Sequence, residues 1–205
     1  MAALDLLASG AARVLGRRLT RAEAEAFAKY LDLLTKWNRL HRLVGSSEPG
    51  WIVDRLFLDS LLFLRVLPPA ARSLLDLGSG AGLPGVPLKI VRTDLRVTLL
   101  ESRQRRASFL STVSRELGFE GVRVVCARAE NVMHELGGSF DAVVARCAGH
   151  PDHVIALGER LARPGGVVLV SGPPRPTSLR LGEWVTTEGI EAGTTRRFAV
   201  HTAAA

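Results

Sequence analysis

The residues of this chain best suited to chemistry are two acids and a group of glycines at fixed spacings. Asp76 lies in an apolar run and is followed by glycines at 78, 80 and 82, and Glu101 ends the next apolar run, nineteen residues beyond Gly82. Glycines let the backbone adopt positive φ and approach a ligand closely, and an acid at the end of the following strand can accept hydrogen bonds from ribose hydroxyls. The pattern therefore predicts a site for a nucleoside-containing cofactor.

Two cofactors fit this pattern. Gly80, Gly82 and Gly85 match the G-x-G-x-x-G fingerprint of dinucleotide sites, with Glu101 at roughly the 20-residue distance that such sites show. Asp76 and the alternating glycines resemble instead the first motif of class I S-adenosyl-L-methionine (SAM) methyltransferases. A dinucleotide fold usually needs two βαβαβ halves plus a substrate domain, and 205 residues leave little room for both. We favour SAM, with a dinucleotide and a tight turn without any ligand as the alternatives.

The remaining sequence supplies elements that position these residues. Residues 1–67 show helical periodicity, with a capping box at Thr20 and Glu23 and a third helix over 51–66. From residue 73 on, strands and helices alternate. Strands are predicted at 73–77, 96–101, 122–127, 140–145 and 166–171, helices at 84–92, 103–117 and 151–162, and extended segments at 184–190 and 196–202.

This alternation predicts an α/β fold with a mostly parallel, Rossmann-like class I methyltransferase sheet. Residues 196–202 could add the C-terminal antiparallel strand of that class, whereas a dinucleotide fold predicts a sixth parallel strand there. We expect an N-terminal helical extension over residues 1–67, packed on a SAM-binding core over residues 68–205.

The amino-acid composition indicates the kind of binding partner and the cellular location of the protein. The net charge is +7, and only three of the 27 basic residues are lysine. Because arginine binds phosphates in a bidentate way and stacks on bases, this charge favours a nucleic-acid partner. The sequence has no apolar run of about 18 residues and no signal-peptide pattern, so we expect a cytoplasmic protein without membrane association. Two cysteines, Cys126 and Cys147, suggest neither a disulfide framework nor a metal cluster.

Ligands of parallel sheets lie beyond the carboxyl ends of the strands, so four loops should meet at one site. They carry Asp76 with Leu83, then Glu101, then the Arg128-Ala129-Glu130 segment, where methyltransferases usually hold the adenine, and finally Arg146. Each of the last two has an alternative. Glu130 could simply occupy the first turn of a short helix, and Arg146 could form a structural ion pair.

The loop that contains Arg146 also narrows the reaction. It reads Ala145-Arg146-Cys147-Ala148 and lacks the Asp/Asn-Pro-Pro-aromatic motif of exocyclic N-methylation. Cys147 is a candidate nucleophile for carbon-5 methylation of cytosine, with a small buried thiol as the alternative. A ring nitrogen such as guanine N7 offers a lone pair and needs no general base, so positioning alone can supply the catalysis.

Two basic groups are candidates for contact with RNA, one after Glu101 and one on the N-terminal helical extension. Arg103, Arg105 and Arg106 lie at the start of the 103–117 helix, where positive charge opposes the helix dipole. Arg39 and Arg42 lie near the end of the second helix. Together they could form a tract for RNA, and a solvated charged surface is the ordinary alternative.

Several segments resemble one family, the bacterial 16S ribosomal RNA guanine-N7 methyltransferases of the RsmG (GidB) type. The resemblance covers Trp37-Asn38 and residues 58–61, 75–88, 97–102, 105–106, 109–110, 128–130 and 140–146. Its most specific part is the Gly-Leu-Pro-Gly-Val-Pro-Leu run. The resemblance implies SAM as cofactor and a guanine of 16S RNA, presented on the 30S subunit, as acceptor. It implies SAM contacts at Gly78, Leu83, Ala129, Glu130 and Arg146.

We expect Asp76, Gly80 and Glu101 to complete the cofactor site, Arg146 to serve catalysis as well, and the protein to act as a monomer without a protein partner. Three positions depart from the family pattern: Phe57 stands where a histidine is usual, Arg42-Leu43-Val44 replaces Asn-Leu-Thr, and Ser171-Gly172 replaces Lys-Gly. Two other interpretations therefore stay open. One is a diverged methyltransferase for another RNA or a small molecule, and the other is a non-catalytic RNA-binding or ribosome-assembly protein.

Overall fold

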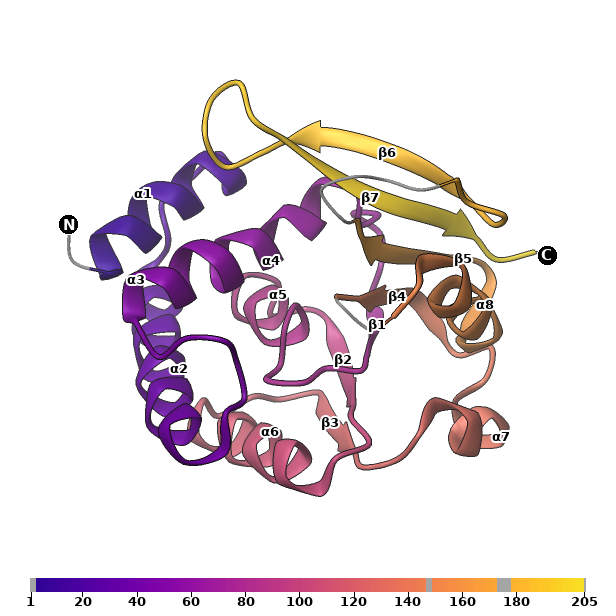
Figure 1. Cartoon of the computed structure of the whole chain (residues 1–205), viewed down its shortest axis with the longest axis horizontal. Helices are drawn as coiled ribbons and strands as arrows, with labels where there is room; N and C mark the ends of the chain where they lie inside the picture. The colour runs from indigo at the N-terminus through magenta and orange to yellow at the C-terminus, as the bar shows by residue number, and fades with distance from the viewer. Residues whose placement is uncertain (1–2, 147–148, 173–177, 205) are drawn as a thin grey trace.

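The computed structural model describes residues 3–146, 149–172 and 178–204. Their central element is a seven-stranded sheet in the order β3-β2-β1-β4-β5-β7-β6 (Figure 1). Strands β1 to β5 are parallel, and β7 runs antiparallel to β5 and β6. The strands are β1 (Ser73–Leu77), β2 (Arg96–Leu100), β3 (Val122–Val125), β4 (Phe140–Ala145), β5 (Ala162–Ser171), β6 (Glu183–Glu188) and β7 (Thr195–Thr202). The predicted antiparallel C-terminal strand is confirmed. Residues 196–202 therefore do not form the sixth parallel strand that a dinucleotide fold predicts.

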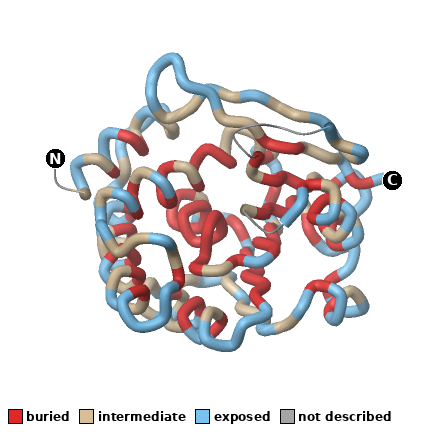
Figure 2. The backbone as a smooth tube through the Cα atoms, viewed as in Figure 1, coloured by how far each residue is buried: buried red, intermediate tan, exposed pale blue. Residues whose placement is uncertain are grey.

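Helices cover both faces of this sheet. The crossovers contain α5 (Gly85–Val91), α6 (Gln104–Glu116) and α8 (Pro151–Leu161), close to the predicted positions. Since side chains alternate along a strand, Leu74 packs into one buried cluster with residues of α5 and α6, and Leu75 into a second cluster with residues of α8. Figure 2 shows the buried residues gathered around the sheet and the exposed ones on the outer sides of the helices.

The N-terminal third is helical, as expected. It contains α1 (Ala3–Leu15), α2 (Arg21–His41), α3 (Pro49–Ile52), the π-helical turn η1 (Val53–Leu58), α4 (Asp59–Leu61) and the 3-10 turn η2 (Leu62–Arg65). The capping box at Thr20 and Glu23 is present. The last four elements form one continuous helical stretch, close to the predicted helix over 51–66, but the sequence did not indicate its π turn. Such turns are rare and often lie at functional sites.

These helices share a hydrophobic core with one face of the sheet. The Tyr30 hydroxyl donates a hydrogen bond to the Ala81 carbonyl at 2.6 Å, and its ring stacks on that of Phe57 at a centroid distance of 4.8 Å. Phe57, which departs from the family pattern, is fully buried. The helical extension therefore supports the glycine turn directly, and Phe57 serves packing.

Two local features differ from the sequence-based expectation. Strand β5 begins at Ala162, four residues before the predicted start, because a register shift beside β4 lets the strand continue past its glycines. The short helix η3 (Ala129–Val132) was considered only as the alternative for Glu130, and α7 (Met133–Leu136) was not predicted, being too short for a periodic pattern. Cys147 and most of the proline-rich segment at 172–176 lie outside the described residues. None of the helices in the described ranges is long and apolar enough to cross a membrane.

Candidate cofactor site and acceptor cavity

The glycine turn after β1 is fixed to the end of β2. The Gly78 and Ser79 amides both donate to the Leu100 carbonyl, at 2.9 and 3.0 Å. The Gly80 amide donates to the Glu101 carboxylate at 2.9 Å. The two features that the sequence paired at a distance are therefore in direct contact, at the carboxyl ends of adjacent parallel strands.

Glu101 is buried, with 5% of its surface exposed. Its second oxygen accepts a hydrogen bond from the Arg103 amide at 2.8 Å, and the Arg106 guanidinium lies 3.9 Å from the first. Since a carboxylate has about four lone-pair sites, two backbone donors leave acceptor capacity for the hydroxyls of a ribose. The carboxylate is also held in one orientation before any ligand arrives.

Two glycines of the turn serve different purposes. Gly80 has φ +58°, and a Cβ built on it would lie 3.8 Å from the Arg106 guanidinium and from the Gly78 carbonyl, so no neighbour crowds this backbone. At Gly85 a Cβ would lie 2.6 Å from Leu99 and 2.7 Å from the Asp76 carboxylate, so this glycine allows close packing instead. An open backbone beside a preoriented carboxylate fits the ribose and amino-acid portions of SAM.

Asp76 lies beneath the turn and is fully buried. One carboxylate oxygen accepts a hydrogen bond from the Gly85 amide at 2.9 Å, and the other has no hydrogen-bond partner among the described residues. Burial raises the pKa of Asp76 to about 7, the Gly85 hydrogen bond lowers it, and the Glu101 charge raises it further. Asp76 thus holds the turn from below, and its contact with a cofactor stays a prediction.

This environment predicts a pH-dependent stability. Between the ordinary aspartate pKa of 3.8 and the folded-state value of about 7, the folded protein holds the extra proton, so the free energy of unfolding falls as pH rises through this window. The Asp76→Asn variant mimics the protonated acid and removes this term. Relative to the variant, the wild type should lose up to about 4 kcal/mol between pH 4 and 8, measured by urea unfolding. If the difference in free energy of unfolding between wild type and Asp76→Asn did not change with pH, the raised pKa of Asp76 would be contradicted.

The remaining predicted cofactor residues follow β1 and β3. Leu83 and Ala129 are both 7% exposed, and Glu130 is exposed. Glu130 lies in the first turn of η3, which was the structural alternative considered for it. The structure therefore places Leu83 after β1 and both Ala129 and Glu130 in η3 after β3, and their contacts with SAM remain predictions.

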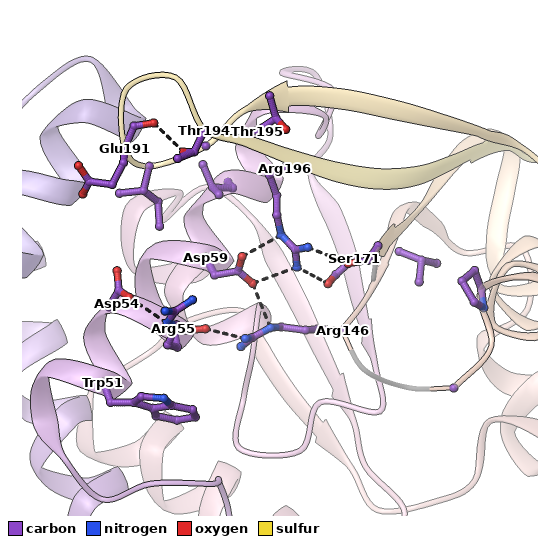
Figure 3. A pocket seen from close by; sticks show the side chains of 17 residues that line it. Trp51, Asp54, Arg55, Asp59, Arg146, Ser171, Glu191, Thr194, Thr195 and Arg196 are labelled. Carbon is purple, nitrogen blue, oxygen red and sulfur yellow. Dashed lines mark hydrogen bonds and ion pairs between the residues drawn. The ribbon is translucent and has the colours of Figure 1, made fainter. Parts of the chain in front are cut away.

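Arg146 extends from the end of β4 into a cluster of charges (Figure 3). Its Nε lies 3.2 Å from the Asp59 carboxylate, and its Nη2 donates to the Arg55 carbonyl at 2.6 Å. Arg196 of β7 approaches the same carboxylate, with its Nε at 2.8 Å, and donates to the Ser171 hydroxyl at 2.6 Å. One carboxylate thus lies between two guanidinium groups, so the cluster carries a net positive charge. The ion pair considered as the alternative for Arg146 is present.

The cluster borders a cavity of about 1030 Å³, which we call the acceptor cavity. It lies between the ends of β4 and β5, the helical stretch that starts at Pro49, and the β6–β7 loop. Arg146 belongs both to this lining and to the loop predicted to face the cofactor. The lining residues are Trp51, Asp54, Arg55, Asp59, Leu62, Arg146, Gly149, Pro151, Val170, Ser171, Gly172, Gly189, Ile190, Glu191, Thr194, Thr195 and Arg196.

Sequence reasoning missed several of these residues. Asp59 belongs to a segment that carried the family resemblance, but no role was assigned to it. Arg196 was placed only in the last strand, and Ser171 was noted only as a departure. The structure shows that the Arg196 guanidinium lies against Ser171 and Gly172, to which it donates at 2.6 and 2.7 Å. A positive charge therefore covers the position where the family usually has a lysine.

Three of the five predicted RNA-binding arginines line a groove between the end of α2 and the start of α6. Arg39, Arg42 and Arg106 line a hollow of about 690 Å³ together with residues 43–47, whereas Arg103 and Arg105 are exposed at the start of α6. Asn38 holds the loop at residues 43–47 in place. Its side-chain amide donates to the Ser46 carbonyl at 3.0 Å and to the Ser47 hydroxyl at 2.8 Å, and its oxygen accepts from the Val44 amide at 2.8 Å. We call this hollow the basic groove.

The antiparallel last strand, the glycine turn and the buried acid after β2 define a Rossmann-like methyltransferase of class I. The chain belongs to the rRNA small subunit methyltransferase G family, whose profile matches residues 23–172. It is 40% identical over 175 residues to "Ribosomal RNA small subunit methyltransferase G" of Sorangium cellulosum (strain So ce56), covering 83% of this chain and 73% of that protein. The protein of the same name from Alkalilimnicola ehrlichii (strain ATCC BAA-1101 / DSM 17681 / MLHE-1) is 41% identical over 166 residues, covering 81% and 73%.

The fold is shared more widely. The O-methyltransferase TomG from Streptomyces achromogenes, solved in complex with SAM, superposes with a TM-score of 0.56 at 19% identity and covers 92% of both chains. This likeness supports the fold alone.

Proposed function

We propose that this protein transfers the methyl group of SAM to N7 of a guanine in the 16S RNA of the small ribosomal subunit. Membership of the methyltransferase G family makes it a SAM-dependent rRNA methyltransferase. The observation that supports this acceptor is Arg146, which lines the acceptor cavity and whose guanidinium is held by Asp59 and the Arg55 carbonyl, so that it can orient a base. Guanine N7 already offers a lone pair, so the reaction needs orientation and no general base.

One set of residues is assigned to binding SAM. Glu101 accepts hydrogen bonds from the ribose hydroxyls, and the backbone of the glycine turn at Gly78 and Gly80 lies along the cofactor. Ala129 and Glu130 border the adenine. When bound, SAM supplies a methyl group on a positively charged sulfur, which a nitrogen lone pair can attack directly.

Arg146 serves the acceptor side. Asp59 and the Arg55 carbonyl fix its guanidinium, so that its position is set before RNA binds. Such preorganisation avoids the cost of ordering a long side chain at the moment of reaction. We assign Arg146 to holding the guanine in the orientation that methyl transfer needs.

The test uses methyl-labelled SAM and 30S subunits from a strain that lacks this modification. Nuclease digestion and mass spectrometry then locate the label. Label on guanine N7 would support enzyme class and acceptor together. Binding of S-adenosylhomocysteine without labelled 30S would contradict the acceptor assignment.

The basic groove should bind the RNA backbone. Replacing Arg39, Arg42 and Arg106 together with alanine should weaken 30S binding and reduce the slope of log affinity against log salt by roughly 1 for each phosphate that is no longer neutralised. A matched triple variant removes Arg21, Arg115 and Arg123, which are exposed arginines outside the groove. Filter binding measures the affinity of each variant for 30S subunits. If the slope of log affinity against log salt were the same for the two triple variants, the basic groove would not bind the RNA backbone.

We further propose that residues 1–67 form a helical extension on a SAM-binding core at residues 68–205, and that the protein acts as a cytoplasmic monomer. The proposed RNA substrate supports that location. The helical part lies at both proposed RNA sites, since it supplies Arg39 and Arg42 to the groove and Asp59 to the cavity.

A further inference from the structure

Trp51 is a partly exposed aromatic residue beside the acceptor cavity. It is 36% exposed and lines the cavity together with Arg55 and Arg146 (Figure 3). The end of its indole lies 3.7 Å from the position that a Cβ on Gly45 would occupy, so it adjoins the loop that borders the basic groove. The Trp51 indole therefore lies between the acceptor cavity and the basic groove, the two proposed RNA sites.

An exposed indole at a polar cavity is suited to nucleobases. Unpaired bases are recognised mainly by stacking on aromatic side chains, because every base has an exposed ring face. The cavity volume of about 1030 Å³ is large enough for a purine nucleotide. No aromatic residue other than Trp51 is among its described lining residues.

Asp54 lies three residues beyond Trp51 on the same helical stretch and lines the same cavity. Its carboxylate pairs with the Nε of its neighbour Arg55 at 3.1 Å, and the two side chains are 42% and 70% exposed. Exposed pairs of this kind contribute little, so this carboxylate can change partners. Asp59, held between two guanidinium groups, cannot do so without breaking the cluster.

We propose that Trp51 and Asp54 recognise the acceptor guanine, the indole by stacking on the purine and the carboxylate by accepting hydrogen bonds from N1–H and the 2-amino group. This inference rests on the proposed function and deepens it. Guanine presents two adjacent donors on that edge, whereas adenine presents an acceptor at N1 that would face the carboxylate oxygens. Binding by this edge leaves N7, on the opposite side of the purine, free to accept the methyl group.

The first test separates binding from catalysis. Trp51→Ala and Asp54→Asn should each raise the KM for 30S subunits about 10-fold or more, with kcat changed less. Trp51→Phe should recover part of the loss, because a phenyl ring can still stack. Affinity for S-adenosylhomocysteine should stay at the wild-type value in all three. Leu4→Ala and Asp32→Asn serve as controls, since both residues lie outside the cavity and are exposed.

The second test needs no methyl transfer. Guanosine monophosphate, added to protein saturated with S-adenosylhomocysteine, should quench tryptophan fluorescence in the wild type and not in Trp51→Phe. Adenosine monophosphate should quench less, and Asp54→Asn should reduce that difference. Wild type that quenches but leaves 30S unlabelled would refute the proposed function alone. The inference about Trp51 and Asp54 would be overturned by a different result. In that result the wild type methylates 30S subunits, Trp51→Ala and Asp54→Asn keep the wild-type KM, and the two nucleotides quench the wild type equally.

Discussion

Replacing Arg146 with alanine is expected to lower methyl transfer to 30S subunits by about 100-fold or more, the loss typical of a misplaced reactant. The Arg146 guanidinium connects the end of β4 to Asp59 and to the Arg55 carbonyl, and it lines the acceptor cavity. Without it, Arg196 is the one cationic partner that Asp59 keeps among the described residues, and the guanine loses the guanidinium that we propose orients it beside the methyl group. Single-turnover assays with saturating SAM and 30S would measure the chemical step.

Two further variants sharpen this prediction. Arg146→Lys keeps the charge but loses the planar fork that contacts two partners, so it should recover only a small part of the activity. Arg123→Ala removes an exposed arginine that pairs with Glu135 outside the proposed sites, and it should behave as wild type. Retention of wild-type turnover in Arg146→Ala, with 30S binding intact, would show that the ion pair with Asp59 is structural only.

Most of the fold could be predicted because its signals are local. Strand β1 reads as a short apolar run that ends in a glycine turn, and α2 begins at a capping box that the structure contains. Gly118 follows α6 with φ +61°, the left-handed conformation in which glycine commonly ends a helix. The π turn over Val53–Leu58 was not predictable in the same way, since its hydrophobic spacing still matches an ordinary helix within one turn.

The site was predictable on its cofactor side and less so on its acceptor side. Glu101 and Gly80 lie twenty-one residues apart, and the class pattern pairs them without any knowledge of the tertiary structure. Asp59 and Arg196 are separated by 137 residues and meet only because β7 inserts beside β5. Trp51 carries no sequence signal either, because a tryptophan on an amphipathic helix usually reads as core. Long-range ion pairs and solvent exposure are properties of the folded chain.

The structure shows the surroundings of the three positions that depart from the family pattern. Phe57 packs against Tyr30 in the core, so it bears on stability rather than on the acceptor. Arg42 ends α2 in a left-handed conformation, with φ 47°, and lines the basic groove. Ser171 receives a hydrogen bond from Arg196. Two departures thus add or keep positive charge near the proposed RNA path, which is compatible with an RNA acceptor.

Replacing Glu101 with alanine is expected to weaken binding of S-adenosylhomocysteine by about 100-fold or more. A hydrogen bond to a charged group contributes roughly 1.5–3 kcal/mol, and the proposal gives Glu101 two ribose hydroxyls. The carboxylate also receives the Gly80 and Arg103 amides, so its removal leaves two donors unpaired and should lower the melting temperature of the ligand-free protein. Isothermal titration gives the affinity, and thermal unfolding with and without ligand separates the two effects.

Glu101→Gln distinguishes charge from shape at this position. The amide has the same size but only one acceptor oxygen, so one of the two backbone donors would face an NH₂ group. We therefore expect this variant to bind the ligand more weakly than wild type, although it fills the same space. Glu25→Gln, which changes an exposed residue of α2 paired with Arg21, should match the wild type in both measurements. Wild-type ligand affinity in Glu101→Ala would mean that the acid after β2 only anchors the glycine turn, and the ribose would then need another acceptor.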